Sequence, residues 1–179
     1  MLDDTYLMQI GWDVIRHFVL DWRKHPVRWG YEVEIQAEIY GRLSKAYDLI
    51  GTGIFEGKYK NYNVPGMKDS QILNRVSCET SVENGEPDLI VWEDADPAHC
   101  NMEDNWPMLL VCEIKVAGNL GSSSEKIKKD EDKIKALLNK RAKYGCLLAF
   151  CQTKKDSDPL PEMLSRGEFN RFDIAIPDS

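Results

Sequence analysis

The chain has 179 residues, of which 42% are hydrophobic and 30% are charged, and its formal net charge is −7 at pH 7. Its length is close to that of one ordinary domain, and its hydrophobic content is sufficient for a packed core. The acidic balance argues against a general nucleic-acid coat protein, because contacts with phosphate require Lys and Arg. It does not exclude a nuclease, because for such a protein the distribution of charge matters more than its sum.

The sequence lacks the features of a membrane or secreted protein. No apolar stretch is long enough to span a bilayer. The beginning of the chain is acidic and lacks the basic and apolar parts of a signal peptide. We therefore expect a cytoplasmic protein with no membrane partner, formed by a single domain over residues 1–179.

The five cysteines do not form a recognisable pattern. Their number is odd, and no two are spaced as a CxxC pair. Three of them, Cys78, Cys112 and Cys146, lie in apolar, strand-like segments, where a thiol behaves as a small hydrophobe. We therefore expect neither a disulfide scaffold nor a zinc site.

Charge changes sign along the chain. Between residues 76 and 114 there are ten carboxylates and no Lys or Arg, whereas between residues 126 and 143 eight basic residues accompany three acidic ones. An acidic segment suits cations, and a basic helix suits phosphates. For most of these side chains we expect the ordinary role of a solvated surface.

The first third of the chain has the pattern of two amphipathic helices. Apolar residues recur there at intervals of three and four, which is typical of a helix with one buried face. The helices are expected over residues 4–24 and 31–50, with Pro26 and Gly30 between them. Residues 51–70 are rich in Gly, Asn and Lys, and we expect a loop.

The period then changes to two, which is typical of a half-buried strand. The Asn84-Gly85 pair predicts a turn. The apolar run 108–116 predicts a central strand that is buried on both faces. Gly145 directly follows a predicted helix, as glycines at helix ends often do. The expected strands cover residues 76–82, 88–92, 108–116, 146–151 and 172–176, the expected helices cover residues 125–143 and 159–165, and an acidic loop is expected over residues 93–106.

Two short motifs place charges at strand ends. Pro87-Asp88 opens one predicted strand, and Glu113-Ile114-Lys115 ends the apolar central strand. Side chains at i and i+2 of a strand share a face, so we expect Glu113 and Lys115 on one side of the sheet. Such charges are costly to bury without partners. Asp88 can reach Glu113 if their strands are neighbours. Two adjacent carboxylates repel each other, and a divalent cation usually offsets this repulsion.

This arrangement resembles the PD-(D/E)XK nuclease superfamily, which has the restriction-endonuclease-like fold. That fold contains a helix, a three-stranded meander that carries the motif, a crossover helix and a further strand. The resemblance covers residues 31–152 and implies an α/β domain in the order α-α-β-β-β-α-β, with a central mixed sheet of four or five strands flanked by helices. Residues 1–25 would form an N-terminal helix, and residues 153–179 a C-terminal extension.

The resemblance also implies roles for the motif residues. Asp88 and Glu113 would ligate Mg²⁺ or Mn²⁺ together with the backbone carbonyl of Ile114. Lys115 would position and activate the attacking water and offset charge on the phosphate. The motif carboxylates are 25 residues apart, which is long for this family, so the acidic loop would be an insertion at the hairpin tip.

Further site residues are implied on two helices. Relatives often add a catalytic glutamate from the first core helix, for which Glu38 is the first candidate, because it flanks the buried stripe, and Glu34 is the second. Asp130 and Lys133 resemble a polar pair that many relatives carry on the crossover helix, and we expect them to support the site.

Three interpretations follow. The first is a Mg²⁺-dependent endonuclease that hydrolyses phosphodiester bonds in DNA, in restriction, defence or repair, with a homodimer as an open alternative to a monomer. The second is a catalytically silent module of the same fold that binds protein or nucleic acid, which the net negative charge and small size favour. The third is a plain α/β domain in which Lys115 extends to solvent. Trp92 and Trp106 offer stacking surfaces for bases, but we expect them in the core.

Overall fold

The computed structural model describes residues 3–57, 71–83, 85–95, 98–102, 104–117, 124–151 and 158–176. Within these ranges the chain forms three α-helices, a mixed sheet of five strands and a separate sheet of two strands, so the expected α/β class is confirmed. The helices are α1 (Asp4–Lys24), α2 (Glu32–Leu49) and α3 (Ser124–Leu138), with a short 3-10 helix at Pro26–Arg28. The strands are β1 (Ile54–Gly57), β2 (Gln71–Asn74), β3 (Val76–Cys78), β4 (Leu89–Trp92), β5 (Met108–Ala117), β6 (Ala142–Cys151) and β7 (Phe169–Ala175).

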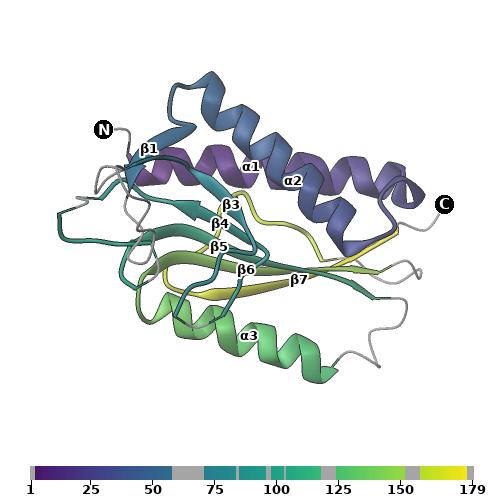
Figure 1. The fold of residues 1–179 in the computed structure, drawn as a ribbon. Helices are drawn as coiled ribbons and strands as arrows, with labels where there is room; N and C mark the ends of the chain where they lie inside the picture. Colours follow the sequence, from purple (N-terminus) through teal and green to yellow (C-terminus); the bar gives the residue numbers. More distant parts are fainter. Residues whose placement is uncertain are drawn as a thin grey trace.

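The five-stranded sheet has helices on both faces. Its strands lie in the order β3-β4-β5-β6-β7; β3, β4 and β5 form an antiparallel meander, whereas β5, β6 and β7 are parallel. Helices α1 and α2 cover one face, and α3 covers the other (Figure 1). The chain passes through α3 between β5 and β6, because two parallel neighbours need a crossover connection.

Helix α1 is part of the core. Its apolar stripe is buried at helical spacing and includes Ile15, Phe18 and Trp22. Phe18 and Trp22 make edge-to-face contacts with Phe150 of β6, at ring-centroid distances of 5.9 and 5.0 Å. No α-helix among the described residues has the length and apolar character needed to cross a bilayer.

Strand β5 divides the interior into two cores. Cys112 and Ile114 pack in the core under α1 and α2, whereas Val111 packs in the core under α3. Successive side chains of a strand alternate between faces. Glu113 and Lys115 therefore lie on the α3 face, at the end of an otherwise apolar strand.

Several expected boundaries change in the structure, and the last two strands begin earlier than expected, at Ala142 and Phe169. The strand expected over residues 76–82 ends at Cys78, because Glu79 adopts a positive φ of 46°. The loop expected over residues 51–70 includes strand β1, while its residues 58–70, like Asn84 of the expected turn, lie outside the described residues. The helix expected over residues 125–143 ends at Leu138, and the chain enters β6 at Ala142.

The short helix expected over residues 159–165 is wrong. The described chain is irregular there, and it lies against α1. The indole N–H of Trp12 donates to the carbonyl of Pro161 at 2.8 Å, so this carbonyl has a partner on α1. Pro161 disfavours the helical conformation of the preceding residue, Leu160, which further disfavours a helix.

Gly145 lies inside β6, where α3 approaches the sheet closely. A Cβ on Gly145 would lie 2.5 Å from Ile134 Cγ2 and 2.9 Å from Leu138 Cδ1. We therefore expect Gly145→Ala to lower the free energy of unfolding by about 1–3 kcal/mol through overpacking, as measured by urea denaturation. In the matched control Gly41→Ala, at an exposed position of α2 where a Cβ meets nothing within 4 Å, the change should stabilise by about 0.5–1 kcal/mol. Equal effects of the two substitutions would contradict this close packing.

Candidate functional site

Asp88 and Glu113 lie side by side at the ends of two neighbouring strands. Leu89 pairs with Cys112 in the antiparallel β4–β5 ladder. The next pair outward is therefore Asp88 and Glu113, and directly opposed residues share a face. The main-chain N–H of Ile114 donates to Asp88 Oδ2 at 2.6 Å, which holds this carboxylate against β5.

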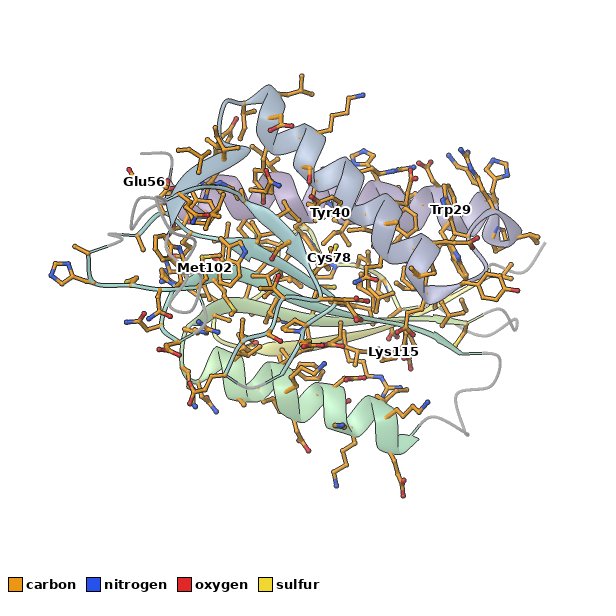
Figure 2. All side chains as sticks on the ribbon, in the orientation of Figure 1. Trp29, Tyr40, Glu56, Cys78, Met102 and Lys115 are labelled. Carbon is orange, nitrogen blue, oxygen red and sulfur yellow. The ribbon has the colours of Figure 1, made fainter. Side chains whose placement is uncertain are left out.

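Lys115 lies where the three predicted metal ligands converge. Its Nζ is 3.5 Å from Asp88 Oδ2 and 3.7 Å from Glu113 Oε2. It also donates to the carbonyl oxygen of Ile114 at 2.8 Å. Figure 2 shows Lys115 at the end of the sheet, between the beginning of α2 and α3. The structure thus brings the motif residues together on one face, as the strand period predicts.

Helix α3 adds Asp130 and Lys133 to this cluster. Lys133 Nζ lies 2.6 Å from Glu113 Oε1, and it donates to the carbonyl of Glu86 at 3.1 Å. Asp130 lies between the two lysines, 3.5 Å from Lys115 Nζ and 3.3 Å from Lys133 Nζ. A spacing of three residues places Asp130 and Lys133 on the same side of the helix. Both expected support residues therefore contact the motif.

The glutamate that α2 contributes is Glu32. Its Oε1 lies 3.0 Å from Lys115 Nζ. Glu38, the first candidate from the sequence, instead pairs with Arg42 at 2.8 Å. Glu34, the second candidate, accepts hydrogen bonds from main-chain N–H groups just before its own helix. Neither reaches the cluster, so the structure replaces both by Glu32.

The buried stripe of α2 explains this choice. At about 100° per residue, Glu32 falls on the helical wheel within the stripe that contains Ile39 and Leu43, whereas the two expected glutamates fall outside it. Gln36 lies one turn after Glu32 on the same side, and its Nε2 donates to the carbonyl of Asp88 at 2.8 Å. The sequence therefore indicates Glu32 as well, provided that the buried stripe is extended back to the beginning of the helix.

The cluster carries an excess of negative charge. Four carboxylates face two ammonium groups. The carboxylates are those of Glu32, Asp88, Glu113 and Asp130, and the ammonium groups are those of Lys115 and Lys133. The formal excess of two negative charges equals the charge that one divalent cation would balance.

Burial and repulsion both act on Glu113, whose side chain is 1% exposed. Burial, followed by the neighbouring charge of Asp88, raises the pKa of Glu113 to about 7, although Lys133 opposes the rise. Glu113 is therefore the carboxylate that gains most from an added cation.

The same carboxylates hold both lysines in their charged form. Burial alone would lower the pKa of Lys115, but Asp88, Glu32 and Asp130 outweigh burial, so its pKa is raised. The pKa of Lys133 is raised in the same way, because its contact with Glu113 outweighs its burial. Both side chains therefore act as fixed positive charges at neutral pH.

A cleft of about 920 Å³ gives access to the cluster. Glu32 and Lys115 line it from the cluster, and Lys126 and Lys129 line it from α3. Glu86, on the segment before β4, lines it as well. A ligand in this cleft would therefore meet the cluster and the basic side of α3 together.

The oxygen atoms around Lys115 suit a hard divalent cation in kind. Carboxylate and carbonyl oxygens, here from Asp88, Glu113 and Ile114, are the ligands that Mg²⁺ accepts. In the part of the chain that the structure describes, no three His, Cys, Asp or Glu side chains are arranged to hold a metal ion. The ammonium group of Lys115 instead lies within 3.7 Å of oxygen atoms of all three residues. These oxygen atoms thus suit Mg²⁺ in kind, and in the structure they face a lysine.

The two tryptophans considered as stacking surfaces belong to the core. Trp92 and Trp106 are both fully buried. Their indole N–H groups donate to Ser77 Oγ at 2.9 Å and to the carbonyl of Glu93 at 2.8 Å. They are core aromatics, as expected, and offer no stacking surface to a base.

Comparisons with known proteins do not assign the chain to a family. No protein-family model, no curated protein and no solved structure matches it. The cluster is therefore interpreted from its own residues and geometry.

Glu113→Gln should change stability in a pH-dependent way. In the folded protein the pKa of Glu113 is raised from 4.5 to about 7. Because its pKa is raised, Glu113 contributes stability that is present below about pH 4.5 and is lost as the pH rises through about 7. The Glu113→Gln variant does not lose this stability. We therefore expect the free energy of unfolding of the variant, relative to that of the wild type, to rise by about 3 kcal/mol between about pH 5 and pH 8.

Urea denaturation of both proteins in EDTA at these two pH values measures the gain. Glu125→Gln, at an exposed position of α3, corrects for the general effect of removing one negative charge. A difference between Glu113→Gln and the wild type that stays constant or narrows as the pH rises would contradict a raised pKa for Glu113.

Proposed function

We propose that the protein is a metal-dependent nuclease of the PD-(D/E)XK type, which hydrolyses phosphodiester bonds in DNA. One observation carries the proposal: two carboxylates and a main-chain carbonyl, from Asp88, Glu113 and Ile114, converge on a single cationic group. A shared cation site of oxygen ligands beside a lysine is what metal-assisted phosphodiester hydrolysis requires.

The arrangement of elements also supports a restriction-endonuclease-like core. Helix α2 precedes an antiparallel meander of β3, β4 and β5, and α3 then connects β5 to the parallel strand β6. The motif residues lie at the adjoining ends of β4 and β5. Apart from the separate sheet of β1 and β2, this order is the one that the motif resemblance implies for residues 31–152.

Asp88, Glu113 and the carbonyl of Ile114 would hold Mg²⁺ or Mn²⁺. A bound ion of this kind acidifies a water molecule and stabilises the extra negative charge that develops on phosphorus. The buried Glu113 contributes a full negative charge once a cation offsets its repulsion with Asp88.

Lys115 acts in this proposal as a fixed cation. Its raised pKa keeps it protonated at neutral pH, so it does not abstract a proton from water. It can instead donate a hydrogen bond to the attacking water and offset negative charge on the phosphate. Glu32 holds its ammonium group at 3.0 Å and so sets the direction from which it acts.

The alternative is a catalytically silent module of the same fold, which binds protein or nucleic acid. The contacts of Lys115 and Lys133 favour this alternative, because they already offset half of the carboxylate charge without a metal ion. The formal charge of −7 also favours it, because it opposes the approach of nucleic acid.

Metal binding separates the two functions. Titration calorimetry with Mg²⁺ and Mn²⁺ should show a site in the wild type that is weakened at least about 100-fold in Asp88→Ala. Asp132→Ala removes an exposed carboxylate that lines the same cleft. Its affinity for the metal ion should stay within about twofold of the wild-type affinity. Cleavage of DNA should be lost in Asp88→Ala alone. A wild type that binds neither metal, with or without DNA, would establish the silent module instead.

A second pair of variants tests the role of α2. Glu32→Gln removes the negative charge that holds Lys115 at 3.0 Å, and misplacement of that cation should lower the cleavage rate by about tenfold. Glu38→Gln makes the same chemical change about one and a half turns along the same helix, away from the cluster. Its cleavage rate should stay within about twofold of the wild-type rate. Both should fold normally, because both glutamates are partly exposed and solvated ion pairs contribute little to stability. Equal rates for the two variants would remove Glu32 from the site.

A further inference from the structure

Helix α3 carries a row of lysines that begins inside the cluster and continues along the cleft. Lys126, Lys129 and Lys133 are separated by three and four residues, so they lie along one side of the helix. All three line the cleft. Lys133 is engaged with Glu113 at 2.6 Å, whereas Lys126 and Lys129 are exposed.

The length of this row suits one nucleic-acid backbone. From Lys126 to Lys133 the helix rises roughly 10 Å. Successive phosphates of one strand are about 3.4 Å apart along a duplex axis and are farther apart along the strand itself, so the row spans at least two phosphates. Its inner end contacts the proposed metal-binding carboxylate, so a strand held along it would bring a phosphodiester bond to the cluster.

The surroundings of the row disfavour a second backbone. Residues 76–114, which supply Glu86 to the cleft, contain ten carboxylates and no Lys or Arg. Glu83, on the same segment, is 53% exposed and pairs with Lys140 of the basic stretch at 2.7 Å. A duplex presents two strands of phosphates, and the second strand would approach Glu86 and Glu83, of which Glu83 already engages the nearby Lys140.

We propose that the cleft binds single-stranded nucleic acid, with Lys126 and Lys129 as its backbone-positioning residues. The inference rests on the proposed function and adds the substrate class to it. Binding of this kind depends on salt and has little sequence preference, because it is made to phosphates rather than to base edges.

Lys128 provides a matched control. Its side chain is exposed on the same helix, between Lys126 and Lys129 in sequence, but it does not line the cleft. Lys126→Glu, Lys128→Glu and Lys129→Glu make the same charge change near the beginning of α3, where an added carboxylate is tolerated by the helix dipole. Differences among the three therefore report position rather than net charge.

Fluorescence anisotropy tests the proposal with a labelled DNA strand of about 12 nucleotides and with the duplex of the same sequence, in EDTA so that neither is cut. The wild type should bind the single strand at least about tenfold more tightly than the duplex. Lys126→Glu and Lys129→Glu should each weaken single-strand binding about tenfold at low salt and lower the salt slope by about 0.7. Lys128→Glu should stay within about twofold.

Each contrary result has its own meaning. Equal or tighter binding of the duplex overturns the single-strand inference and leaves the nuclease proposal standing. Equal weakening by Lys128→Glu and Lys129→Glu overturns the assignment of the row. Failure to bind either DNA overturns the whole inference. Loss of the proposed function is seen separately, as the absence of metal binding by calorimetry and of cleavage of either DNA.

Discussion

Repulsion between Asp88 and Glu113 is the constraint around which the rest of the site is built. The β4–β5 register opposes these two carboxylates on one face, next to the apolar residues of β4 and β5. Glu113 is almost fully buried there, and its pKa rises to about 7 as a result. Such a pair needs positive charge close by, and Lys115 and Lys133 supply it from β5 and from α3.

The three layers of the fold meet at this constraint. Helix α2 contributes Glu32 and Gln36 from one side of the sheet, and α3 contributes Asp130 and Lys133 from the other. The approach of α3 depends on the absence of a side chain at Gly145. Packing of the core therefore sets the positions of the charges, and the charges in turn leave a formal excess of two negatives beside an open cleft.

Local periodicity predicted the parts of the site that lie on strands. Alternation along β5 placed Glu113 and Lys115 on one face, and the expected neighbouring strand placed Asp88 beside them. The helical partner was harder to predict, because Glu32 lies in the first turn, where the buried stripe has few residues to define it. The role of Lys133 depends on how α3 packs against β6, which no local pattern contains. Gly145 was expected to end a helix, whereas it lies within β6.

The proposed function requires a divalent cation where Lys115 lies in the structure. A crystal structure of the protein grown with Mn²⁺, with anomalous diffraction to locate the metal, tests this requirement. We expect an Mn²⁺ ion bound by carboxylate oxygens of Asp88 and Glu113 and by the carbonyl of Ile114, with the ammonium group of Lys115 displaced toward Glu32. An Mn²⁺ ion bound elsewhere, with Lys115 still among these oxygens, would contradict it.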